Sequence, residues 1–201
     1  MKSQVALALI ELDSVPAGIF TADAMLKEAP IALLKSGTVH NGKYLILVGG
    51  SVASVGMAFA KGMSKGRDHL LDAVFLPDIH ESVYQACMGI RQSCGSEALS
   101  IVEMATVAAI LKSADAAVKG SNVQLVELRL ADDLGGKSLA IYAGKVEDVE
   151  MALNLSEAAL ENKAFLLSQS IIPSIDPELA KQLNSSTYFS ATDLTTLEQG
   201  E

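Results

Sequence analysis

Two short stretches of the sequence carry side chains that can bind ions, and both have the composition of turns. The stretch 36–43 contains His40, and the stretch 131–137 contains Asp132 and Asp133. Imidazole and carboxylate groups are ligands for divalent metals, and a ring of carboxylates attracts cations and repels anions. A lone histidine or acidic pair supplies this chemistry only where several copies meet. The elements that carry these turns therefore decide what they do.

Other reactive residues have simpler explanations. Cys87 and Cys94 lie seven residues apart, a spacing that fits neither a zinc site nor a redox pair, so we expect two free thiols. The Gly-Gly-Ser run at 49–51 could bind an anion through free amides, but its counterpart Gly144-Lys145 lacks the second glycine, so helix initiation explains it better. The sequence contains no nucleophile elbow, phosphate-binding loop or metalloprotease motif, so we predict no catalytic residue and no enzyme activity.

The elements that must position the two turns occur twice in the chain. The sequence Ala-Asp-Ala-Met-Leu-Lys at 22–27 returns as Ala-Asp-Ala-Ala-Val-Lys at 114–119, which is 92 residues later. The spacing grows to 94 after the first turn and to 96 at Pro77, which matches Pro173. Repeats of this length are duplicated domains and not solenoid units. Chains that each carry two copies can form a ring whose apparent symmetry, counted in domains, is twice its true rotational order, counted in chains. Assembly is therefore the first hypothesis for function.

Each repeat predicts an α+β domain of order β-α-β-β-α-β, the split ferredoxin-like arrangement with helices on a mostly antiparallel sheet. In the first repeat we expect strands at 5–10, 31–34, 44–48 and 70–76, and helices at 15–29 and from residue 52. In the second we expect strands at 123–130, 138–142 and 165–172, and helices at 107–119 and from residue 146. The predicted organisation is a first domain at 1–87, a linker at 88–97, a second domain at 98–183 and a loose polar tail at 184–201.

Composition narrows the classes of partner. The chain has 201 residues, is 50% hydrophobic and carries a formal charge of −9. This charge disfavours nucleic acid and anionic lipid, because both need a concentrated positive field. The longest apolar runs have only strand length and no signal-peptide layout opens the chain. We therefore expect a cytoplasmic protein without a transmembrane helix, whose excess apolar residues cover subunit interfaces.

Taken together, these features resemble a known family. The β-α-β-β-α-β unit, the Asp-Ala-x-x-Lys phrase that ends its first helix, the Gly-Lys that closes its hairpin turn and the Gly-x-Val-x-x-Val that opens its second helix are similar to the bacterial microcompartment (BMC) shell domain. The similarity runs from about Val5 to Leu183. Two copies in one chain resemble the tandem-domain shell proteins. The strand order is not circularly permuted, as in the propanediol-utilisation shell protein T type.

This resemblance implies a structural role. It implies a flat, pseudohexameric homotrimer that forms a tile in the protein shell of a microcompartment in the bacterial cytoplasm. The implied partners are other shell proteins and the enclosed enzymes, and the central pore would pass small metabolites, metal or electrons. The loops around that pore match the two hairpin turns, namely Thr38, Val39, His40, Asn41, Gly42, Asp132, Asp133, Leu134 and Gly135. An equally good explanation of the two aspartates is that they keep a loop in water.

The resemblance also gives roles to two lysines. Lys27 and Lys119 match the edge lysines that hold neighbouring tiles together. Without the resemblance, both are solvated cations at helix ends, where positive charge complements the helix dipole.

His40 departs from the family pattern. In the shell protein T type this turn carries a cysteine, and three copies on the threefold axis hold an iron-sulfur cluster. Histidine commonly replaces only some cysteines of a cluster, so three histidines put a cluster in doubt, whereas they suit Zn²⁺ or a similar ion. We expect no resident cofactor, a metal-free ring of His40 side chains as purified, and weak metal uptake there. We expect His69 and His80 to be surface residues.

One further functional class stays open on the sequence alone. The same ferredoxin-like unit occurs in small-molecule-sensing regulatory proteins. A sensor should show a ligand-induced shift in melting temperature, whereas a shell tile should form sheets or tubes as its concentration rises.

Overall fold

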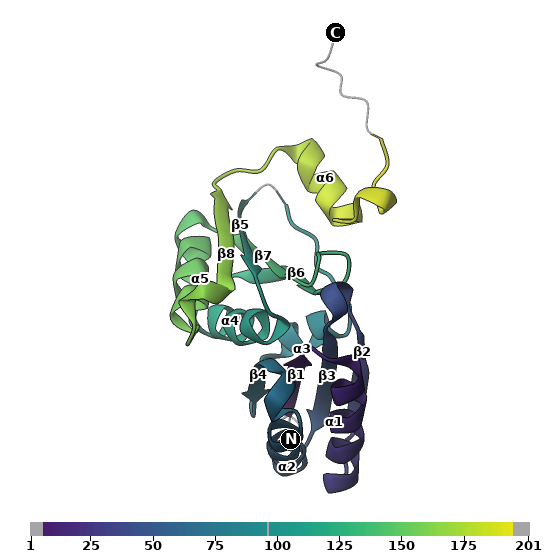
Figure 1. Ribbon diagram of the computed structural model, residues 1–201. Helices are drawn as coiled ribbons and strands as arrows, with labels where there is room; N and C mark the ends of the chain where they lie inside the picture. The colour runs from purple at the N-terminus through teal and green to yellow at the C-terminus, as the bar shows by residue number, and fades with distance from the viewer. Residues whose placement is uncertain (1–5, 96, 195–201) are drawn as a thin grey trace.

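The computed structural model describes residues 6–95 and 97–194, which form two domains of the same topology (Figure 1). The first domain contains β1 (Ala6–Leu12), α1 (Val15–Glu28), β2 (Leu33–Thr38), β3 (Tyr44–Gly50), α2 (Val52–Lys65), β4 (Leu70–Leu76) and α3 (Glu81–Cys87). The second contains β5 (Ala98–Met104), α4 (Val107–Gly120), β6 (Gln124–Leu130), β7 (Ser138–Gly144), α5 (Val146–Ala158), β8 (Leu166–Ile172) and α6 (Pro177–Ser185). Short 3₁₀ turns lie at η1 (His40–Gly42), η2 (Arg67–His69), η3 (Lys163–Phe165) and η4 (Phe189–Ala191).

Both sheets are antiparallel and have equivalent strand orders, β2-β3-β1-β4 and β6-β7-β5-β8. This is the β-α-β-β-α-β arrangement that the two repeats predict, so the α+β class is confirmed. Serine or threonine caps start the first helix of each domain, where Ser14 accepts a hydrogen bond from the Ala17 amide and Thr106 accepts one from the Ala109 amide.

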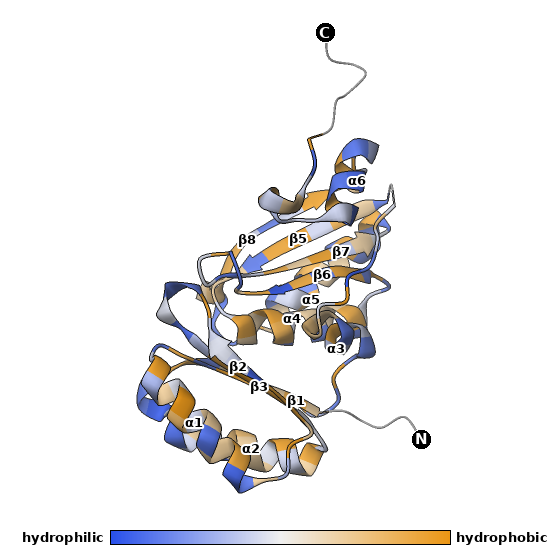
Figure 2. Ribbon diagram, turned by 90° about the vertical axis from the view of Figure 1, so that its right-hand side faces the viewer, coloured by the Kyte–Doolittle hydropathy of each residue, from blue (hydrophilic) through white to orange (hydrophobic). Residues whose placement is uncertain are grey.

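The two domains stack so that helices and sheets alternate (Figures 1 and 2). Helices α1 and α2 cover one face of the first sheet, and α4 and α5 cover one face of the second. Helices α3 and α4 lie between the sheets, and α6 lies on the far side of the second sheet. The central strand β1 is buried along its whole length. Its even-numbered residues pack with α1 and α2, whereas Leu7 and Leu9 pack in one cluster with apolar residues of α4.

The structure corrects some expected boundaries. Strand β2 spans Leu33–Thr38 and not 31–34, because Ser36 and Gly37 continue the ladder opposite Ile46 and Leu45. Polar residues and glycine are tolerated there, since β2 is an edge strand of the sheet. The other strands and helices begin and end within a few residues of their predicted limits.

The expected loose tail is also wrong for its first part. Helix α6 continues to Ser185, beyond the predicted domain limit. Thr187 then donates a hydrogen bond of 2.7 Å to Glu127, and the ring of Tyr188 lies 3.9 Å from the guanidinium carbon of Arg129. These contacts hold residues 187 and 188 on the second domain. Residues 195–201 of the predicted tail lie outside the described residues.

Two glycines of α2 give a matched test of helix packing. An added Cβ at Gly62 would lie 2.4 Å from Ile10 and 2.6 Å from the sulfur of Met25, whereas one at Gly56 would meet Phe75 at an ordinary 3.7 Å. We expect Gly62→Ala to lower the free energy of unfolding by about 1–3 kcal/mol through overpacking. Gly56→Ala should leave it unchanged or raise it by up to about 1 kcal/mol, because alanine favours the helix. Urea unfolding at matched protein concentration measures both, and equal effects would contradict the packing argument.

Candidate functional site: the paired turns and the domain seam

The two hairpin turns singled out in the sequence lie side by side. The Nδ1 atom of His40 accepts a hydrogen bond of 3.2 Å from the backbone N–H of Asp133, and Nε2 lies 3.8 Å from the Asp133 carboxylate. Both side chains are more than half exposed. The first turn thus presents its imidazole to the second turn, so the two turns meet within one chain.

Local backbone geometry makes this contact possible. Asn41 and Asp133 have positive φ angles of 67° and 57°, a region that asparagine, aspartate and glycine tolerate. A glycine is also needed at position 136, because a Cβ there would lie 3.0 Å from the His40 carbonyl oxygen. The Asn-Gly and Gly-Gly pairs that predicted the two turns therefore also allow them to touch.

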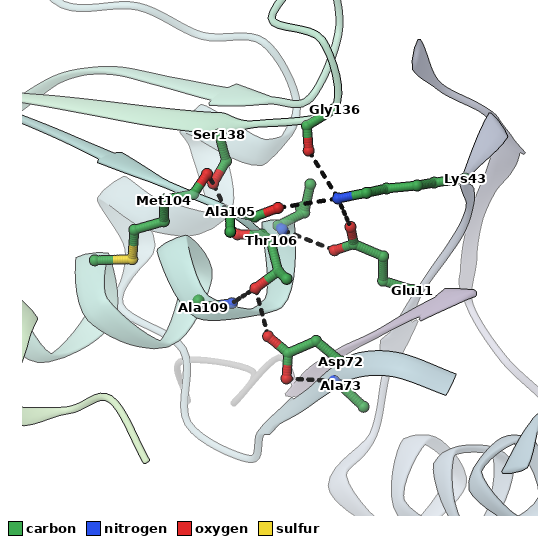
Figure 3. Close-up of polar contacts among 11 residues, drawn as sticks. Glu11, Lys43, Asp72, Ala73, Met104, Ala105, Thr106, Ala109, Gly136 and Ser138 are labelled. Carbon is green, nitrogen blue, oxygen red and sulfur yellow. Dashed lines mark hydrogen bonds and ion pairs between the residues drawn. The ribbon is translucent and has the colours of Figure 1, made fainter. Parts of the chain in front are cut away.

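Beneath the turns, a polar cluster joins the two domains (Figure 3). Lys43 Nζ donates to Glu11 Oε1 at 2.7 Å, and to the carbonyl oxygens of Ala105 at 2.9 Å and Gly136 at 3.0 Å in the second domain. The other Glu11 oxygen accepts a hydrogen bond of 2.8 Å from the backbone N–H of Val107, at the start of α4. We call these five residues the domain seam. A buried carboxylate here binds an ammonium group on one side and a helix N-terminus on the other.

The electrostatics of the seam are those of a buried pair. The Glu11 side chain is fully buried and that of Lys43 is 13% exposed. Burial raises the pKa of Glu11, and Lys43 and the Val107 N–H partly oppose that rise by stabilising the charged form. Nearby, Thr106 Oγ1 donates to the Asp72 carboxylate at 2.5 Å, which is a second side-chain tie between the domains.

Sequence reasoning gave the seam no role. Its signal was present, because an acidic residue ends the apolar strand of each repeat, as Glu11 and as Glu103, and each repeat also carries a lysine after its turn, Lys43 or Lys137. In the second domain the equivalent pair also forms, at 2.8 Å, but there Lys137 is 43% and Glu103 is 30% exposed. The same ion pair is thus buried in one domain and open in the other.

The two lysines predicted for assembly have different surroundings. Lys27 is 75% exposed and pairs only with Asp23 among the described residues, one helical turn earlier. Lys119 pairs with Asp115 and also donates to the carbonyl oxygen of Asp78 in the first domain. Lys119 therefore bridges the two domains, whereas the ion pair of Lys27 stays within its own helix.

The potential metal ligands are spread over the described part of the chain. Within 6–95 and 97–194, no three His, Cys, Asp or Glu side chains gather closely enough to hold an ion. Cys87 and Cys94 are both free and buried, and burial raises the pKa of the Cys87 thiol to about 12. Neither turn contains a cysteine, so an iron-sulfur cluster does not fit the donors present there. His69 and His80 are exposed, as the sequence predicted.

No helix in the described part of the chain is long and apolar enough to cross a lipid bilayer.

Comparison with known proteins gives one consistent result. The BMC domain family matches residues 6–79 and again 98–175. The chain is 39% identical over 178 residues to the bacterial microcompartment shell protein PduT of Citrobacter freundii, covering 89% of this chain and 97% of the relative. It is 29% identical over 202 residues to the carboxysome assembly protein CcmO of a Synechocystis species, covering 93% of this chain and 67% of the relative.

A solved structure agrees with these relatives. The crystal structure of a microcompartments protein from Desulfitobacterium hafniense DCB superimposes with a TM-score of 0.77 at 32% identity, and covers 89% of this chain and 99% of that one. With a BMC domain in each half and similarity along nearly its whole length, the chain belongs to the family of bacterial microcompartment shell proteins with two tandem BMC domains.

Proposed function

We propose that this shell protein works as a ring of three chains, in which the second domain of each chain packs on the first domain of the next. One observation carries the proposal. Positions that are equivalent in the two domains are buried where the domains meet inside the chain, and exposed where the same face has no neighbour.

The first helix of each domain shows this difference most clearly. Leu111 of α4 is fully buried and belongs to the apolar cluster that includes the first sheet. Its equivalent 92 residues earlier, Ile19 of α1, is 55% exposed, and the neighbouring Phe20 is 59% exposed. An apolar helix face of this kind needs cover. The first sheet covers the matching face of α4, so we expect the second sheet of another chain to cover α1.

The opposite side of the chain offers the matching surface. Val83 of α3 is fully buried between the domains, whereas its equivalent Leu179 of α6 is 45% exposed. On the first domain, Leu34 of β2 adds to the uncovered side that carries α1: it lies opposite Val48 and is 41% exposed, whereas Leu125 at the equivalent ladder position of β6 is 3% exposed. The bare side of the second domain and the bare side of the first are therefore the two halves of one interface.

The polar seam repeats in the same way. Glu11 binds the amide of Val107 in the following domain, so the equivalent Glu103 would bind the amide of Val15 in the next chain. Lys137 would donate across the same boundary, as Lys43 does inside the chain. If the contact inside each chain is repeated between chains, three chains form a closed ring of six domains. Such a ring has a pseudo-sixfold axis.

In this ring we place the paired turns around the central pore. Each chain would contribute His40, Asp132 and Asp133, and the acidic side chains would favour cations and small neutral metabolites over anions. The tile would lie in the shell of a microcompartment in the bacterial cytoplasm, beside other shell proteins and against the enclosed enzymes. Lys27 and Lys119 would hold neighbouring tiles together, with Lys27 the more available of the two.

The seam gives a paired test of the ring. Glu11→Ala should lower the free energy of unfolding by about 3–5 kcal/mol, because it leaves the buried Lys43 without its counter-charge. Glu103→Ala removes a partly exposed pair, so it should lower the free energy of unfolding of the single chain by no more than about 1 kcal/mol. It should, however, make the trimer dissociate at a higher protein concentration than the wild type does. Urea unfolding and native mass spectrometry across a dilution series measure the two effects. A wild-type protein that stays at 21.0 kDa at every concentration would contradict the ring.

Tiling is tested with Lys27→Ala. We expect this variant to keep its fold and trimer, because an exposed i,i+4 ion pair contributes at most about 0.5 kcal/mol, but to form fewer sheets in negative-stain electron microscopy. The matched control is Lys181→Ala, since Lys181 is 71% exposed and also pairs along its own helix. Equal sheet formation by the two variants under matched salt would show that Lys27 does not hold tiles together.

The pore position of His40 is tested by metal uptake. If three copies meet on the axis, their Nε2 atoms remain available for one ion, because Nδ1 is already hydrogen-bonded to Asp133. We expect the anaerobically purified protein to be metal-free and to take up about one Zn²⁺ per trimer, weakly. This uptake should disappear in His40→Ala and persist in His69→Ala, which alters another exposed histidine. Metal retained by His40→Ala would show that the turns do not form the site.

A further inference from the structure

A hollow lies beside the first turn. It has a volume of about 110 Å³ and lies on the first sheet near its contact with the second domain. Its walls are formed by Leu9, Leu45 and Leu47 of the sheet, by the β2 segment from Lys35 to Val39, and by Leu130 and Asp132 of the second domain. All these residues belong to one chain.

The equivalent place in the second domain is filled by the chain itself. Lys35 pairs with Leu47 in the first sheet as Glu127 pairs with Ile141 in the second, so Lys35 and Glu127 are equivalent. By the same register Gly37, opposite Leu45, is equivalent to Arg129, opposite Leu139. Above Glu127 and Arg129 lie Thr187 and Tyr188, the residues that follow α6.

The segment that follows α3 does not repeat this cover. It turns toward the second domain instead, where the Gln92 amide donates to the Val126 carbonyl and Arg91 donates to Glu127 at 2.9 Å. The first sheet is therefore left open where the second is closed. Where the second sheet has Arg129, the first sheet has Gly37. The first sheet therefore also lacks the side chain that supports the ring of Tyr188 in the second domain, and this accounts for the empty volume.

The charge at the site is reversed relative to its filled counterpart. Glu127 is an acceptor that binds two donors, Arg91 and Thr187. Lys35 is a donor, and it makes no hydrogen bond or ion pair within residues 6–95 and 97–194. Lys35 is exposed and Asp132 also lines the hollow, so an anionic group would pair with Lys35 only at the Lys35 end, away from the Asp132 carboxylate.

The size and lining of the hollow limit the remainder of the ligand. The floor is formed by three leucines, which favour a hydrocarbon group. An engineered apolar cavity of about 150 Å³ holds benzene, so a hollow somewhat smaller admits a chain of about three to five carbon atoms. Nucleotides and larger cofactors do not fit.

We propose that this hollow binds a short-chain carboxylate, with the hydrocarbon chain on Leu9, Leu45 and Leu47 and the carboxylate group on Lys35. The site shares Val39 and Asp132 with the two turns that we place at the pore. Resting on that proposed function, occupancy would alter the position of the turns, so a small anionic metabolite would be sensed where small molecules cross the shell.

Butanoate is the probe, and the full-length protein is titrated with it by calorimetry and ligand-observed NMR at low salt. We expect saturable binding of about one butanoate per chain at millimolar concentration, and much weaker binding of butan-1-ol, which lacks the charge. Lys35→Met should weaken the affinity at least about fivefold, since it removes only the charge. Gly37→Val should abolish binding by filling the hollow, and it should fold because a Cβ at Gly37 meets nothing within 4 Å.

The control is Lys145→Met, because Lys145 lines a second, wider depression formed by β6, β7 and the start of α5. It should bind butanoate like the wild type. No saturable binding, equal binding of butan-1-ol, or a loss that follows Lys145 and not Lys35 would each overturn the proposal. Native mass spectrometry of the same samples tests the trimeric ring separately from the butanoate site. A monomer could still bind butanoate, and a trimer could fail to bind it.

Discussion

Each sheet of this protein has apolar residues on both faces, but its own first two helices cover only one of them. In the first sheet, Ala8 and Ile10 face α1 and α2, while Leu7 and Leu9 on the same strand need cover from elsewhere. The second domain supplies it with α4. A sheet that is apolar on both sides cannot leave one side in water without a large cost, so a BMC domain depends on a neighbouring domain. The layered stack of the two domains and the proposed ring both follow from this requirement.

An apolar interface alone would not fix how the domains are turned relative to one another, and the seam does so. Glu11 must reach both Lys43 and the start of α4, and Lys43 must reach two carbonyl groups of the second domain. A small rotation would break several of these bonds and leave charge buried without a partner, which is costly. The same geometry places the turn containing His40 against the turn containing Asp133. The arrangement of the two turns therefore depends on an ion pair below them.

Gene duplication let the two copies diverge in charge and size at equivalent ladder positions. The second domain uses Glu127 and Arg129 to bind the segment after its last helix, whereas the first has Lys35 and Gly37 and an open hollow. Identical copies could not differ in this way, because each would carry the same cover. A chain with two domains can keep the interface constant while one copy acquires a separate site.

The sequence by itself determined the repeated α+β unit, the order of its elements along the chain, its helix caps and its two turns, because each depends on local patterns that the chain shows twice. Apolar runs, a Ser or Thr cap and Asn-Gly or Gly-Gly pairs act over a few residues, and the structure confirms them. It did not determine that Glu11 would be buried at the second domain while Glu103 stays open, since the two look alike in sequence. Nor did it show that Thr187 and Tyr188 would cover one sheet and leave Lys35 of the other facing a hollow. Those outcomes depend on contacts between residues about 60 to 96 positions apart, between the two domains for Glu11 and within the second domain for Thr187, which no local sequence pattern specifies.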